Sequence, residues 1–187
     1  MLAMRDIPNL ISIGRIILVA PFVWVLLDQQ YALALILFFV AGASDGLDGF
    51  LAKHYGWQSR LGGILDPLAD KFLLISAYVC MGWLGQLPWW LIGLVLLRDV
   101  VIVTGAVAYN FHVERFEASP LLISKLNTLM QIVLVLAVLM HMGIMSLPER
   151  LIEGLVGVVA LTTIASGLMY VTRWGGKAAQ AHRKSNG

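Results

Sequence analysis

The chain has 187 residues, of which 59% are hydrophobic and 13% are charged, and its formal net charge is +2. Soluble domains carry about 25% charged residues, so this composition excludes an ordinary soluble protein and favours a membrane protein. The small net charge gives no reason to expect a nucleic-acid partner, because such partners require a strongly basic surface.

Six mainly apolar stretches follow one another along the chain, and each is close to the roughly 20 residues that a helix needs to cross the hydrocarbon core. They lie at about 10–27, 30–53, 61–85, 88–110, 121–143 and 151–173. The first one contains Arg15 and is not followed by a signal-peptidase cleavage pattern, so we expect it to be retained. The connections are short and no change of composition marks a second domain. The sequence therefore predicts an all-α polytopic membrane protein with six transmembrane helices in a single domain, residues 1–187.

Lysine and arginine residues predict the orientation of these helices. Placing the amino terminus in the cytoplasm leaves only Arg150 on the opposite side and gives the cytoplasmic side Arg5, Lys53, Arg60, Arg115, Arg173, Lys177, Arg183 and Lys184. Basic residues concentrate in the cytoplasmic connections of membrane proteins. We therefore expect both termini in the cytoplasm, in a bacterial inner membrane.

Four aspartates lie between residues 43 and 71, in a chain that is otherwise short of charge. Asp45 and Asp48 are three residues apart, and Asp66 and Asp70 are four apart, so on helices each pair shares one face. The stretch between the pairs is polar and contains Gly56, which suits a tight connection between antiparallel neighbours. The two pairs can therefore meet at the cytoplasmic end of the second and third helices.

Four carboxylates that meet near a membrane cannot all stay ionised without a counter-charge. Divalent cations with oxygen ligands suit this need, and Mg²⁺ is commonly held by carboxylates together with substrate phosphates. Two ions about 3.5–4 Å apart can clamp the attacking and leaving oxygens of a displacement at phosphorus. Charges inside membranes also mark ion or proton transporters, but those often consist of two similar halves with broken helices, and this sequence has no such repeat. The cluster therefore favours phosphoryl chemistry.

The stretch reads Asp45-x2-Asp48-Gly49-x2-Ala52-Lys53-x8-Gly62-x3-Asp66-x3-Asp70. It resembles the signature of the CDP-alcohol phosphatidyltransferases, integral membrane enzymes that form phospholipid headgroups. Every defined position but one matches in residue type and spacing. Lys53 stands where family members usually carry arginine, and a lysine cannot make the planar two-pronged contact to phosphate. This departure leaves open an active enzyme, an altered donor site or a lost activity.

The resemblance implies the chemistry of the site. It implies two divalent ions, Mg²⁺ or Mn²⁺, in a polar cavity that faces the cytoplasm, with ligands Asp45, Asp48, Asp66 and Asp70. Asp70 would also act as general base for an acceptor alcohol, which attacks the phosphorus that carries diacylglycerol and releases CMP. The donor, CDP-diacylglycerol, would bind at Asp48, Gly49, Ala52, Lys53 and Gly62. The resemblance also implies that the protein is a homodimer and that it contacts membrane lipids.

Basic residues near or within the apolar stretches are candidates for binding the acceptor, because a phosphate-bearing acceptor needs a cluster of arginine and lysine. We take Arg15, Arg60, Arg98 and Lys125 as these candidates. Lys125 lies in a polar patch with Ser124, Asn127 and Thr128. Two alternatives stay open, since Arg98 and Asp99 could form structural ion pairs with other helices and Arg15 could extend to the lipid headgroups.

The segments "IPNLISIGRI", "LDPLADK" and "SKLNTLMQ" are similar to one branch of the family, the CMP-forming cardiolipin synthases, which join CDP-diacylglycerol to phosphatidylglycerol. Phosphatidylglycerophosphate synthases share the aspartate signature, use glycerol 3-phosphate, and more often have Arg-Glu where this chain has Arg98-Asp99. The sequence therefore predicts phosphatidylglycerol as the acceptor, with glycerol 3-phosphate as the alternative.

Overall fold

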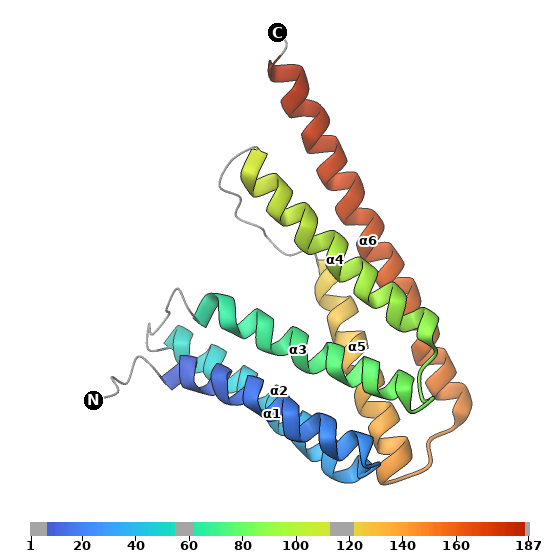
Figure 1. Cartoon of the computed structure of the whole chain (residues 1–187). Helices are drawn as coiled ribbons and strands as arrows, with labels where there is room; N and C mark the ends of the chain where they lie inside the picture. Colours follow the sequence, from blue (N-terminus) through green and yellow to red (C-terminus); the bar gives the residue numbers. More distant parts are fainter. Residues whose placement is uncertain (1–6, 55–61, 113–121, 186–187) are drawn as a thin grey trace. The chain divides into compact units, whose positions relative to one another are not determined.

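The structure is a computed structural model that describes the backbone of residues 7–54, 62–112 and 122–185, and the side chains of residues 11, 13–44, 69–104 and 122–172. In these ranges all regular elements are α-helices, which confirms the predicted all-α class (Figure 1). The helices are α1 (Ile7–Leu27), α2 (Tyr31–His54), α3 (Gly62–Trp83), α4 (Trp89–His112), α5 (Leu122–Gly143) and α6 (Glu149–Ser185).

The predicted apolar stretches agree with α1–α5 to within a few residues, and the sixth agrees with the apolar segment Glu149–Thr172, although α6 itself is longer. Its apolar run ends near residue 173, whereas α6 continues to Ser185. Hydropathy indicates which part of a helix can lie in lipid. It does not indicate where the backbone hydrogen bonding of the helix ends. The segment 177–184 is rich in Ala, Gln, Lys and Arg, which favour helix. This preference offsets the cost of Gly175 and Gly176, which is about 1 kcal/mol each.

The helices form two compact units. The first contains α1, α2, α3 and residues 135–143 of α5; within it α1 packs along both α2 and α3, and α2 also contacts α3 (Figure 1). The second contains α4, residues 122–134 of α5 and α6; within it α4 packs along α6. The chain thus builds two helical units, each with its own buried side chains.

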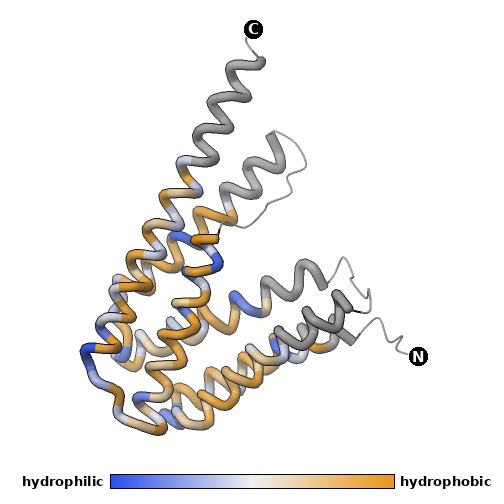
Figure 2. The backbone as a smooth tube through the Cα atoms, turned by 180° about the vertical axis from the view of Figure 1, so that it is seen from behind, coloured by the Kyte–Doolittle hydropathy of each residue, from blue (hydrophilic) through white to orange (hydrophobic). Residues whose placement is uncertain are grey.

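Apolar residues fill the inside of each unit and also cover its outside. In the first unit Phe22 of α1 is fully buried, and its ring centroid lies 5.8 Å from that of Phe38 on α2. Large apolar side chains are nevertheless exposed, including Trp24 at 76%, Trp83 at 77% and Leu161 at 69%. Hydrophobic colours cover most of the coloured tube in Figure 2. Apolar surface on this scale suits contact with lipid.

Two described segments are long and apolar enough to cross a membrane, Leu122–Gly143 and Glu149–Thr172. The segments Ile13–Leu27 and Tyr31–Ser44 are apolar but shorter. The number of six transmembrane helices and the cavity open to the cytoplasm stay predictions.

The third helix ends in a turn that requires a glycine. Gly85 has a φ of 73°, in the left-handed region. The N–H of Gln86 donates to the carbonyl of Met81 at 2.8 Å, and the N–H of Gly85 donates to the carbonyl of Gly82 at 3.0 Å. This pair of bonds is the Schellman motif, which satisfies carbonyls that the end of a helix leaves open. Pro88 follows and prevents α3 from continuing.

The end of α5 approaches the start of α2 closely at Gly143, within the first unit. A Cβ atom built on Gly143 would lie 2.6 Å from the backbone nitrogen of Ala32 and 2.8 Å from the carbonyl carbon of Tyr31. Both are backbone atoms, which cannot swing aside as the tip of a side chain can. The position therefore has no room for a side chain.

Replacing Gly143 with alanine is expected to lower the free energy of unfolding by about 1–3 kcal/mol, the usual cost of forcing a methyl group into a packed site. The matched control is Gly154→Ala on α6, where nothing lies within 4 Å of the added Cβ. That change should be neutral or stabilise by about 0.5–1 kcal/mol, because alanine favours helix over glycine. Thermal unfolding of both variants in detergent measures the difference, and equal midpoints would contradict the close approach.

Candidate active site

The four aspartates occupy the same end of two neighbouring helices. Asp45 and Asp48 lie in the second half of α2, and Asp66 and Asp70 lie in the first turns of α3. Residues 55–61 connect the two helices, which contact each other within the first unit. The backbone therefore allows the two predicted pairs to meet, and their meeting stays a prediction. The side chains of Asp45, Asp48 and Asp66 lie outside the described residues.

The donor set of this cluster suits divalent cations. Carboxylate oxygens are the hard ligands that Mg²⁺ and Mn²⁺ prefer, and the two contacting helices carry four carboxylate groups. Among the side chains that the structure describes, no three His, Cys, Asp or Glu residues gather, and only Asp70 of the four aspartates is in that set. The cluster therefore fits the predicted ions by its chemistry, and the assignment of ligands stays a prediction.

Asp70 is ion-paired with Arg15 of α1, inside the first unit. The Nη1 atom of Arg15 donates a hydrogen bond to Oδ1 of Asp70. The side chain of Arg15 is 0% exposed, whereas that of Asp70 is 46% exposed. One face of the carboxylate is thus held by a buried guanidinium, and the group remains reachable from outside. Arg15 does not extend to the surface, and its pairing with Asp70 was not predicted from the sequence.

Other predicted residues of the donor site cannot be placed atom by atom. Residues 49, 52 and 53 belong to α2, residue 62 begins α3, and all their side chains lie outside the described set: Gly49, Ala52, Lys53 and Gly62. Arg60, a predicted acceptor contact, lies in the stretch 55–61, outside the described residues altogether. Their roles stay predictions.

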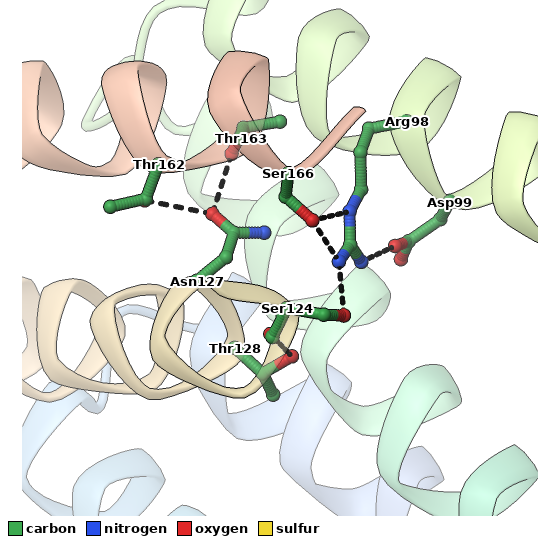
Figure 3. A network of polar contacts seen from close by, with 8 residues as sticks. All are labelled: Arg98, Asp99, Ser124, Asn127, Thr128, Thr162, Thr163 and Ser166. Atoms are coloured by element: carbon green, nitrogen blue, oxygen red, sulfur yellow. Dashed lines mark hydrogen bonds and ion pairs between the residues drawn. The ribbon is translucent and has the colours of Figure 1, made fainter. Parts of the chain in front are cut away.

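A second polar cluster joins the three helices of the second unit around Arg98 (Figure 3). Nη1 of Arg98 donates to Oδ1 of Asp99 at 2.8 Å. Nε and Nη2 donate to Oγ of Ser166 at 3.2 and 2.7 Å, and Nη2 also donates to Oγ of Ser124. Arg98 is 6% exposed. Its charge is therefore balanced by a neighbouring carboxylate, and its nitrogens are engaged by hydroxyls on α5 and α6.

Asn127 continues this cluster along α5. Its Oδ1 accepts hydrogen bonds from the hydroxyls of Thr162 and Thr163 on α6, at 2.9 and 2.8 Å. Asn127 is fully buried, and its Nδ2 has no hydrogen-bond partner among the described residues. Hydroxyl and amide side chains commonly hold helices together in membranes. The α6 residues were missed from the sequence, although polar residues at positions 162, 163 and 166 of an apolar helix share one face.

Lys125 lies beside this cluster in sequence but is not among the residues of the network in Figure 3. Ser124 and Asn127 turn toward the network, whereas Lys125 is exposed. Of the predicted acceptor residues, Arg15 contacts Asp70, Arg98 is enclosed among hydroxyls, and Lys125 is open at the surface. The described residues therefore offer one exposed cationic candidate from this set.

The sequence matches the family model described as CDP-alcohol phosphatidyltransferase over residues 5–172. This range includes all four aspartates, the Arg15–Asp70 pair and the Arg98 cluster.

Similar proteins fall into two groups by name. The chain is 36% identical over 183 residues to the chloroplastic CDP-diacylglycerol--glycerol-3-phosphate 3-phosphatidyltransferase 1 of Oryza sativa, covering 88% of this chain and 56% of that protein. It is 35% identical over 147 residues to the CMP-forming cardiolipin synthase of Rattus norvegicus, covering 70% of this chain and 49% of that protein. The human protein of the same name is 34% identical over 147 residues, with the same two shares. The chain thus spans about half the length of these relatives.

Proposed function

Because the chain belongs to the CDP-alcohol phosphatidyltransferase family, we propose that it transfers a phosphatidyl group from CDP-diacylglycerol to the hydroxyl of an acceptor in phospholipid synthesis. The observation that carries the proposal is the placement of four aspartates at one end of the contacting helices α2 and α3. Asp70, half-exposed and held by a buried arginine, is the group suited to act on the acceptor.

In this proposal the aspartates hold two divalent ions, Mg²⁺ or Mn²⁺: Asp45, Asp48, Asp66 and Asp70. When bound, the ions neutralise the donor diphosphate and stabilise negative charge at phosphorus. Gly49, Ala52 and Gly62 are small enough to let the nucleotide approach the helix backbone. Lys53 supplies a positive charge to the diphosphate, as a point charge in place of the two-pronged contact of an arginine.

The transfer is a displacement at the phosphorus that carries diacylglycerol. Asp70 accepts the proton of the acceptor hydroxyl, and the acceptor oxygen forms a bond to that phosphorus. The bond from the same phosphorus to the bridging oxygen breaks, and CMP leaves with that oxygen and the electron pair. The products are a new phosphodiester lipid and CMP.

Phosphatidylglycerol is the acceptor that we propose, so that the product is cardiolipin. The enclosure of Arg98 supports this choice, because Asp99 already balances its charge and the hydroxyls of Ser124 and Ser166 engage it. The dianionic glycerol 3-phosphate needs an open cluster of cations. Glycerol 3-phosphate stays the second candidate because the name of the rice relative favours it, which would make this chain a phosphatidylglycerophosphate synthase.

The exposed apolar side chains and the family support a membrane-embedded enzyme. The distribution of lysine and arginine supports termini and an active site on the cytoplasmic side. A bacterial inner membrane and a homodimer stay predictions.

Product analysis tests the acceptor. The full chain in detergent, with CDP-diacylglycerol and Mg²⁺, is offered phosphatidylglycerol or glycerol 3-phosphate, and mass spectrometry identifies the lipid formed. We expect cardiolipin as the product. We expect kcat/KM for phosphatidylglycerol to be at least about 10-fold higher than kcat/KM for glycerol 3-phosphate. Phosphatidylglycerophosphate as the main product would instead establish the second candidate.

A further substitution examines Lys125 in the same assay. Lys125→Met is expected to raise the acceptor KM by about 10-fold through loss of a charge-assisted contact to phosphate. Thr172→Val on α6 is the control, because Thr172 is exposed and its hydroxyl donates to carbonyls of its own helix, at Leu168 and Met169. An unchanged KM in Lys125→Met would remove Lys125 from the acceptor site.

A further inference from the structure

Arg15 lies in a part of the molecule where burying a charge costs free energy. It sits on α1, is 2% exposed, and belongs to the largest fully buried side chains of the structure. Ionised side chains inside membrane helices are retained where they have a partner and a task. Arg15 donates a hydrogen bond to Asp70, 55 residues away on α3.

The pair is asymmetric. The guanidinium side is 0% exposed and the carboxylate side is 46% exposed. A guanidinium is planar and rigid, and its N–H groups point in fixed directions. Because α1 packs along α3 and Arg15 is enclosed, the guanidinium can fix the rotation of the Asp70 carboxylate. Oδ1 faces Arg15, and the carboxylate as a whole is still partly exposed.

The environment of Asp70 on α3 adds to this constraint. Its neighbour Ala69 is 0% exposed and Leu73 is 5% exposed, so the helix turn that carries Asp70 is itself anchored in the core of the first unit. Both the backbone and one oxygen of Asp70 are therefore held from the protein side. A general base works only within hydrogen-bond reach of the proton that it removes.

We propose that Arg15 is a positioning residue for Asp70: by holding Oδ1 it fixes the orientation in which the carboxylate meets the acceptor hydroxyl. This inference rests on the proposed transferase function. It replaces the role predicted from the sequence, in which Arg15 binds the acceptor itself. The two roles differ in measurable ways, since a residue that binds the acceptor sets its KM, whereas a residue that orients the base sets kcat.

The test measures kcat and both KM values of the full chain for Arg15→Gln, Arg15→Lys and the control Phe22→Leu. Arg15→Gln should lower kcat by about 100-fold, the scale of a misplacement of about 1 Å, with both KM values within about threefold of wild type. Arg15→Lys keeps the charge without the rigid fork and should recover part of the lost kcat. Phe22→Leu loosens the same helix at a buried ring contact and should lower the unfolding temperature with kcat unchanged.

A double substitution separates positioning from a merely structural role. If Arg15 acts through Asp70, adding Arg15→Gln to Asp70→Asn should lower the residual kcat no further, because residues that act as a unit are not additive. A further drop of the same size as in the wild-type background would overturn the proposal. A raised acceptor KM with unchanged kcat in Arg15→Gln would also overturn it and would restore the acceptor-binding role.

Thermal unfolding provides a readout that does not need activity. Asp70→Asn removes the carboxylate beside a buried guanidinium and should lower the unfolding temperature more than Arg15→Gln, which leaves a half-exposed carboxylate. The double variant should then be more stable than Asp70→Asn alone. Additive losses would show that Arg15 does not hold Asp70 and would overturn the proposal. Wild-type protein that releases CMP with no acceptor would count against the proposed function, and the unfolding cycle would still decide on the pair.

Discussion

Replacing Asp70 with asparagine is expected to lower kcat for CMP release by about 10²–10⁴-fold, the contribution of a positioned general base. Asparagine has nearly the same shape, and its carbonyl oxygen can still accept from Arg15, but it cannot take up the proton of the acceptor. The loss should therefore appear in kcat with little change in the donor KM. Steady-state release of CMP, measured with phosphatidylglycerol and Mg²⁺, provides the comparison.

Asp28→Asn is the matched control. Asp28 is exposed in the connection between α1 and α2, where Nε2 of Gln30 donates to its Oδ2 at 2.6 Å. The same chemical change there should leave kcat within about twofold, as is usual for surface positions away from the site. If Asp70→Asn kept half of the wild-type rate, Asp70 would not be the base.

Removing divalent cations is expected to abolish activity. Treatment with EDTA should reduce CMP release by at least about 10³-fold, since the ions stabilise the charge that develops at phosphorus. Titrating Mg²⁺ or Mn²⁺ back should restore it. The same titration should raise the unfolding temperature, because a ligand that binds only the folded state stabilises it and because the four aspartates repel one another without a counter-charge.

EDTA that has been saturated with Mg²⁺ beforehand is the control for effects of the chelator on detergent or lipid, and it should leave the rate unchanged. Full activity after chelation and dialysis into metal-free buffer would contradict the assignment of the aspartates to metal ions. An unchanged unfolding temperature during the titration would contradict it independently.

Helix positions were largely predictable because the apolar runs are long, and some of the breaks between them contain residues that end helices. Pro88 and the left-handed Gly85 separate α3 from α4, and both residue types signal such breaks in a sequence. The end of α6 was not predictable in this way, since a helix can outlast its apolar run. The sequence also gave no sign that Gly143 meets the backbone of Ala32, because that contact depends on how two distant helices pack.

The candidate site could also be predicted from the sequence only in part. Spacing alone placed each pair of aspartates on one helix, because residues three or four apart share a face. The partners of the buried arginines could not be deduced, since Arg15 meets Asp70 at a separation of 55 residues and Arg98 meets Ser166 at a separation of 68. Hydropathy shows that a charge lies within an apolar helix; the packing of the helices decides what it faces.

The most direct measurement follows the phosphorus that the reaction is proposed to move. CDP-diacylglycerol labelled with ³²P at the phosphorus next to diacylglycerol is incubated with the purified full chain, Mg²⁺ and phosphatidylglycerol, and the lipid and water-soluble products are separated. The account predicts label in the new phospholipid, unlabelled CMP in equal amount, and neither product without an acceptor. Label in a water-soluble product, or CMP release that is independent of acceptor, would contradict phosphatidyl transfer.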